Sequence, residues 1–160
     1  MAEPSVEVES VRAGRQHDLA LFARYNEALS EGRLRDELNG QLYNRRTDSD
    51  FTRALQHVLE LAVLEEGRFV NETVQEKFEA FTQALAALRQ FLALHFFGVG
   101  GPRELGGTEQ LMLYPELRHK SEGPDFEYYD TKVDELNALC EATEREYLAF
   151  RQAVKKKLVT

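Results

Sequence analysis

The stretch Asn71–Phe97, NETVQEKFEAFTQALAALRQFLALHFF, decides the fold expected of this chain. Its apolar residues recur at alternating intervals of four and three, which places them on one face of an α-helix. The positions on this face are Val74, Phe78, Phe81, Leu85, Leu88, Leu92 and then His95. Asn71 or Thr73 can cap the start of the helix, and Gly98 and Gly100 follow its end. Because a broad apolar face needs cover in water, the spacing predicts a central helix packed against other helices.

Four further segments show the same helical spacing. They are a first helix over Val11–Leu29, a short second helix over Leu34–Leu42, a third over Asp50–Glu66 and a last helix that begins at Gly123–Asp125. Asp48 or Ser49 is a suitable cap for the third helix. Residues 98–123 are rich in glycine and are predicted to be irregular, with Leu111–Tyr114 packing back onto the helices. No pair of strands is expected.

The predicted fold class is therefore all-α, a single bundle of four to five helices with a long central helix and a long C-terminal helix. Residues 11–160 are expected to form one domain, because neither a repeat nor a linker divides them. Residues 1–10 are expected to be a mobile acidic N-terminus. The near-heptad spacing of the two long helices predicts packing at a shallow angle of about 20°.

Composition limits the classes of function. The net charge of −8 disfavours a general nucleic-acid binder, although an acidic chain can still carry a basic face. Eight arginines precede residue 54 and are interspersed with seven acids, which favours an ordinary mixed surface over an RNA or acidic-partner surface; they are Arg12, Arg15, Arg24, Arg33, Arg35, Arg45, Arg46 and Arg53. No apolar run approaches the roughly 20 residues that span a bilayer, and the start of the chain lacks signal-peptide features. With a single cysteine, Cys140, a cytoplasmic protein is expected.

Arg89 and His95 lie six positions apart near the end of the central helix. This Arg-x5-His spacing resembles the Arg-x4-6-His signature of HEPN-type ribonucleases, which are small helical proteins that often dimerise. The resemblance implies a metal-independent ribonuclease in which both residues act on RNA across a dimer cleft. The alternative is a salt-bridging Arg89 and a His95 hydrogen-bonded at the edge of the core, because positions six apart point about 120° away from each other on a helix.

Three other patterns resemble functional sites. Glu116 and His119 have the Glu-x-x-His spacing of helical carboxylate metal sites, but such sites need a second motif, so a surface turn is favoured. The glycine-rich run 98–108 lacks the Gly-Lys-Ser/Thr ending of a phosphate-binding loop. Cys140 lies on the apolar face of the last helix, which favours an inert thiol. No catalytic residue, metal, cofactor or small-molecule substrate is predicted.

The function expected from these observations is that of a non-enzymatic helical interaction protein, a subunit, adaptor or regulator that acts through helix-face contacts. A protein partner or self-association as a homodimer is expected, because long apolar helix faces can serve both. The alternative is the HEPN-like ribonuclease that uses Arg89 and His95.

Overall fold

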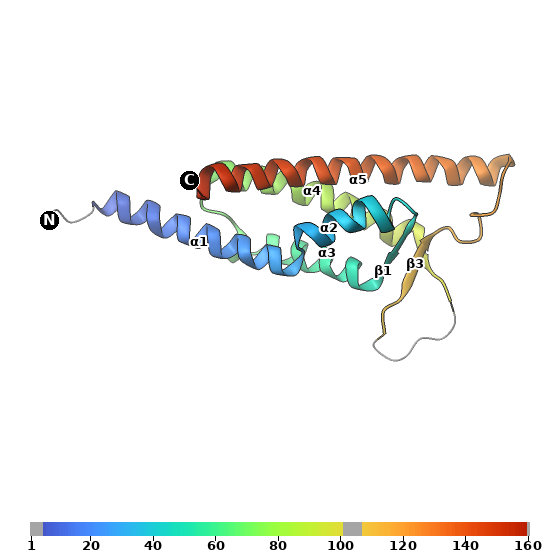
Figure 1. The fold of residues 1–160 in the computed structure, drawn as a ribbon, viewed down its shortest axis with the longest axis horizontal. Coiled ribbons are helices and arrows are strands. Elements are labelled where there is room, and N and C mark those ends of the chain that lie inside the picture. The colour runs from blue at the N-terminus through green and yellow to red at the C-terminus, as the bar shows by residue number, and fades with distance from the viewer. Residues whose placement is uncertain (1–4, 101–106, 160) are drawn as a thin grey trace.

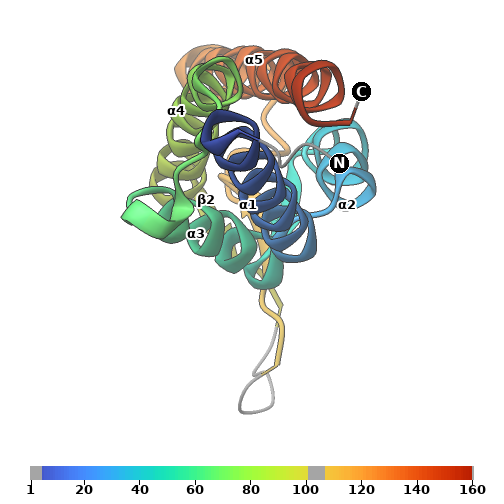
Figure 2. The ribbon, with the colours of Figure 1, turned by 90° about the vertical axis from the view of Figure 1, so that its left-hand side faces the viewer.

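The computed structural model describes residues 5–100 and 107–159, and these residues are mainly helical, as predicted (Figure 1). The α-helices among them are α1 (Val6–Ala28), α2 (Glu31–Asp36), α3 (Ser49–Ala62), α4 (Glu72–His95) and α5 (Gly123–Leu158). A π-helical turn, η1 (Glu37–Gln41), continues α2, and a 3-10 turn, η2 (Glu65–Gly67), follows α3. The 36-residue α5 runs along α4, and the other helices lie on the same side of α5 (Figures 1 and 2).

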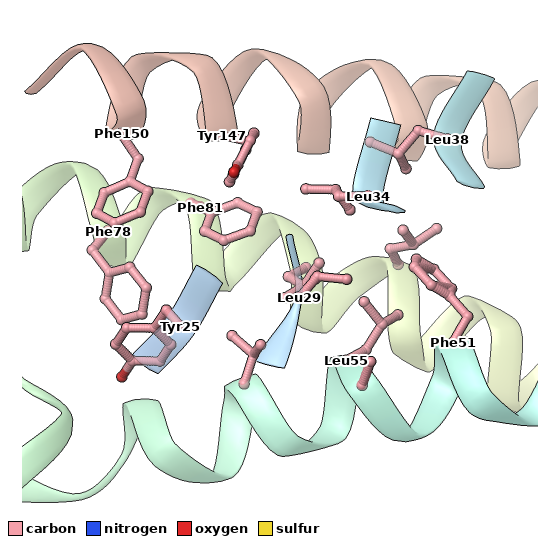
Figure 3. Packing of buried hydrophobic residues seen from close by; sticks show 14 of the residues in the cluster. Tyr25, Leu29, Leu34, Leu38, Phe51, Leu55, Phe78, Phe81, Tyr147 and Phe150 are labelled. Atoms are coloured by element: carbon pink, nitrogen blue, oxygen red, sulfur yellow. The ribbon is translucent and has the colours of Figure 1, made fainter. Parts of the chain in front are cut away.

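The core is a continuous cluster in which aromatic rings of α1, α4 and α5 meet (Figure 3). The ring centroids of Phe78 and Phe150 lie 5.1 Å apart, and those of Phe81 and Tyr147 also lie 5.1 Å apart. The ring of Tyr25, from α1, packs against that of Phe78, and the two centroids lie 4.5 Å apart. Aromatic pairs in such geometries stabilise a core by about 0.5–1.5 kcal/mol each beyond the apolar area that they bury. These rings therefore contribute to the packing of α4 against α5, together with buried aliphatic side chains such as Leu85 and Leu136.

The helix caps follow the local sequence. Asn71 accepts a hydrogen bond from the Val74 amide at 3.0 Å, so Asn71 is the cap of α4 and Thr73 is not. Asp48 caps α3 in the same way, accepting from the Phe51 amide at 2.8 Å. Each bond satisfies an amide that has no partner within its own helix.

The expectation that the chain has no strand pair is wrong. Three short strands, β1 (Arg46–Asp48), β2 (Phe96–Gly98) and β3 (Gln110–Leu113), form an antiparallel sheet in the order β1-β3-β2. The strands are too short to show the alternation of apolar and polar residues from which a strand is predicted. The sheet takes in Gly98 and residues 110–113 of the segment predicted to be irregular, of which residues 101–106 lie outside the described part of the chain.

Several helix boundaries differ from the predicted ones. α1 begins at Val6, because Ser5 caps it by accepting a hydrogen bond from the Val8 amide at 3.3 Å; residues 1–4 of the expected mobile N-terminus lie outside the described residues. α3 ends at Ala62, and a 3-10 turn replaces its expected last turn. α4 ends at His95, because the next residues pair with β3. Among the described residues no helix is both long and apolar enough to cross a bilayer.

Candidate functional site

The first half of α1 packs against little of the remaining protein. From Val6 to His17 no side chain is buried, and Asp18 is the first buried residue of the helix. Figure 1 shows the start of α1 extending beyond the ends of α4 and α5. The exposed stretch from Val6 to His17 is about 18 Å long at 1.5 Å per residue. An isolated helix of fewer than about 12–15 residues is marginal in water, so contact with another molecule would stabilise this half.

From Gly14 onward, α1 is anchored where the link between η2 and α4, residues 68–71, passes it. The Asp18 carboxylate, 1% exposed, accepts hydrogen bonds from the amides of Val70 at 2.7 Å and Asn71 at 2.8 Å. Gly14 lets α1 approach this link, because a Cβ there would lie 3.2 Å from Cγ1 of Val70. Arg15 donates to the Leu158 carbonyl at 2.5 Å, which ties α1 to the end of α5. These contacts fix the direction in which the exposed half projects.

An acidic groove of about 1090 Å³ opens beside this anchor. It runs over η2, the link and the first turns of α4, and five of its lining side chains are glutamates: Glu65, Glu66, Glu72, Glu76 and Glu79. Arg68 lines it as well and pairs with Glu79 at 3.2 Å. Leu64 and Val70 give the groove exposed apolar surface, and Val63 beside it is 83% exposed. The groove thus combines a net negative charge with apolar contacts.

His95 belongs to a cluster of aromatic side chains at the other end of α4. Its Nδ1 atom lies 2.6 Å from the hydroxyl of Tyr114, which lies 2.9 Å from that of Tyr128. Burial, and then the nearby Lys132 ammonium, lower the pKa of His95 below its usual value. Burial and the Tyr128 hydroxyl raise the pKa of Tyr114 to about 12. At neutral pH the hydrogen-bonded His95 and Tyr114 are therefore both uncharged.

Arg89 does not join this cluster. It is half-buried on α4, and no hydrogen bond or ion pair connects its guanidinium to another of the described residues. Six positions along a continuous helix separate the directions of Arg89 and His95 by about 120°. Within one chain the two side chains are not brought together, and the ribonuclease that uses them across a dimer stays a prediction.

The remaining candidates from the sequence lie apart from one another. Glu116 and His119 are exposed on the turn that follows β3. Among residues 5–100 and 107–159, no three His, Cys, Asp or Glu side chains are grouped so as to hold a metal ion. Cys140 is half-buried on α5, and burial raises the pKa of its thiol to about 12, which keeps it protonated at neutral pH.

A second hollow, the arginine cleft, brings Arg118 together with three of the eight arginines for which an ordinary mixed surface was expected. It measures about 1120 Å³ and is lined by four exposed arginines: Arg33 of α2, Arg45 and Arg46 at the start of β1, and Arg118 from the turn after β3. Within the described part of the chain, none of the four guanidinium groups forms an ion pair. Because the arginines come from three separate segments, no local sequence motif predicts that they line one cleft.

Glu37 of η1 lines the arginine cleft and is 8% exposed. The Thr47 hydroxyl donates to its Oε2 atom at 3.3 Å. Burial, and then the nearby Asp48 carboxylate, raise the pKa of Glu37 to about 7. The carboxyl is therefore about half-protonated at neutral pH, unlike an exposed glutamate.

This pKa predicts how stability depends on pH. The folded protein binds the Glu37 proton more tightly than the unfolded chain does, so the contribution of Glu37 to the free energy of unfolding should fall as pH rises from about 4.5 to about 7. In Glu37→Gln this fall should be absent. The unfolding free energy of the variant minus that of wild type should therefore be about 1–3 kcal/mol larger at pH 8 than at pH 5. Urea denaturation at both pH values measures the difference. An exposed control, Glu127→Gln, should keep the wild-type profile; equal profiles for both variants would contradict the prediction.

Comparisons of this chain with protein-family models, curated proteins and solved structures find no match. The candidate sites are therefore defined by the geometry of this structure. Figure 1 places the start of α4, with the acidic groove, and β1, with the arginine cleft, toward opposite ends of the bundle.

Proposed function

We propose that this chain is a non-enzymatic helical interaction protein, an adaptor, subunit or regulator that binds a basic amphipathic segment of a partner protein. The observation that carries the proposal is the exposed first half of α1, over Val6–His17, which projects beside the acidic groove. The helical bundle is the unit that presents both surfaces.

Charge complementarity selects the partner. The five glutamates of the groove face one arginine, so these six side chains carry a formal net charge of −4. Lysine or arginine side chains of a partner would reduce the repulsion among these carboxylates and speed the encounter at low ionic strength. The exposed side chains of Leu64 and Val70 supply the apolar contact that an amphipathic helix requires.

The exposed half of α1 would complete the binding surface. Val11 is exposed on it, and a partner helix laid between α1 and the groove would cover this valine together with Val70. The cost of ordering this half of α1 would be met on binding, which makes affinity sensitive to its helix propensity. The same proposal assigns the protein to the cytoplasm, where the single thiol of Cys140 stays reduced.

The proposal is tested with a fluorescently labelled peptide of lysine and leucine at helical spacing, titrated into the full chain. Anisotropy should show saturable binding that weakens with added salt, because exposed charges are screened within about 10 Å at 0.1 M salt. The double variant Glu72→Gln/Glu76→Gln should bind the peptide about three- to tenfold more weakly, since each exposed charge pair contributes about 0.2–1 kcal/mol. Hydrogen exchange over residues 6–17 should slow when the peptide is bound.

Matched controls separate this surface from general attraction to an acidic protein. Glu127→Gln/Glu141→Gln removes two exposed charges from α5 and should leave the affinity unchanged. An acidic analogue of the peptide should not bind. Equal binding by both double variants would reject the groove. A stable dimer in sedimentation that excludes the peptide would replace the partner protein by a second copy of this chain.

A further inference from the structure

The arginine cleft concentrates positive charge on a protein whose net charge is −8. Its four guanidinium groups face two lining carboxyls, those of Asp36 and Glu37. The side chain of Glu37 is engaged by the Thr47 hydroxyl. None of the four arginines has an ion-pair partner among the described residues, and the two carboxyls offset only part of their positive charge. An anion in the cleft would offset the remainder.

The fold holds these arginines on defined backbone. Arg46 lies in β1, where it is paired with Met112 of β3. Arg45 precedes it with φ of +61°, a left-handed conformation that costs a non-glycine residue about 1 kcal/mol or more. Its carbonyl accepts from the Leu113 amide at 3.1 Å, and its guanidinium lies 5.9 Å from the ring centroid of Tyr129. Strained backbone retained in this way is characteristic of ligand-binding sites.

The π-helical turn η1 forms another wall of the same cleft. Single π-helical turns occur frequently at functional sites, because they displace side chains from the regular helical positions. Here the turn presents Glu37 and Gln41 to the cleft, and the side chain of Asn44 donates to the Gly40 carbonyl at 2.9 Å. Two unusual backbone features and four arginines that form no ion pair with the described residues thus converge on one hollow.

The chemistry of the lining points to phosphate with an attached ring system. Planar guanidinium groups bind phosphate oxygens through two parallel hydrogen bonds. Tyr43 lines the cleft and is 71% exposed, so its ring is free to stack on a planar group. Amide side chains of Gln41 and Asn137 can donate to and accept from the edge of a base. A volume of about 1120 Å³ is of the size that holds a small molecule.

We propose that the arginine cleft binds a nucleotide, with Arg33, Arg45, Arg46 and Arg118 on its phosphates and Tyr43 on its base. The site is independent of the acidic groove, so partner binding can fail while nucleotide binding holds, and the reverse. The role is ligand binding, and no reaction is assigned to it.

Calorimetric titration of the full chain with ATP, with inorganic tripolyphosphate and with single-stranded RNA tests the proposal. ATP should bind, and tripolyphosphate, which carries similar charge without a base, should bind more weakly. Arg46→Gln should lower the affinity for both small molecules about tenfold or more, as expected for a lost charged hydrogen bond. Tyr43→Ala should lower the affinity for ATP and leave that for tripolyphosphate unchanged.

Arg45→Gly keeps the test independent of folding, because glycine adopts the left-handed conformation without strain. This variant should be at least as stable as wild type in urea and still lose ATP affinity about tenfold. Arg24→Gln removes an exposed arginine of α1 that does not line the cleft and should bind ATP as wild type does. Unchanged ATP affinity in Arg45→Gly and Arg46→Gln would overturn the site. Equal affinity for ATP and tripolyphosphate, or markedly tighter binding of RNA, would overturn the nucleotide as its ligand.

Discussion

Replacing Gly67 with alanine should lower the free energy of unfolding by about 3 kcal/mol or more. An ideal Cβ at this position would lie 1.9 Å from the carbonyl oxygen of Leu61 and 2.8 Å from the hydroxyl of Tyr25. The nearer atom belongs to the backbone, so the end of α3 must move to admit the methyl group. The Tyr25 hydroxyl donates to the Gly67 carbonyl at 2.7 Å, and this buried hydrogen bond would be disturbed by the same movement. Urea denaturation measures the loss.

Gly32 is the matched control for this substitution. It lies within α2, and nothing stands within 4 Å of its ideal Cβ. Gly32→Ala should therefore stabilise the protein by up to about 1 kcal/mol, because alanine is favoured over glycine within a helix. If the two substitutions had equal effects, close packing at Gly67 would not be the reason for its glycine.

The second large effect is expected at Asp18. Its carboxylate accepts from the two adjacent amides of Val70 and Asn71 while it is 1% exposed. Asp18→Asn keeps the shape of the side chain but replaces one acceptor oxygen with an NH₂ group. This buried NH₂ donor would then face a backbone N–H, which is also a donor. The expected loss of unfolding free energy is about 2–4 kcal/mol.

A local measurement distinguishes this mechanism from general destabilisation. Hydrogen exchange at the amides of Val70 and Asn71 should accelerate in Asp18→Asn more than exchange in the middle of α5. Asp134→Asn, an exposed substitution on α5, should change neither stability nor exchange at the link. The prediction fails if both variants lose the same stability.

The long helices could be predicted because their signal is local. All six apolar positions predicted for the seam of α4, from Val74 to Leu92, are buried. The same is true of Leu136, Tyr147 and Phe150 in α5. Both helices bury one face along their length, so the alternation of intervals of four and three in the sequence predicts which residues are buried. His95, at the end of the α4 seam, is half-buried and bonded to Tyr114 instead.

The sheet and the arginine cleft could not be predicted in this way. Arg46 and Met112 are paired in the sheet although 66 positions separate them in the sequence. Arg118 reaches the cleft only because β3 has paired with β1 and placed the following turn beside η1. Spacing within one segment holds no information on such contacts, since they depend on how the segments meet.

Sequence alone determined that this protein is mainly helical, where its two longest helices lie and which of their faces are buried, because helical periodicity and capping act over a few residues. Only the tertiary structure decided that the first half of α1 stays exposed, that five glutamates line one groove and that four arginines line one cleft. Those arrangements come from packing between distant segments. The mutual positions of charged side chains, on which both proposals rest, exist only once that packing has formed.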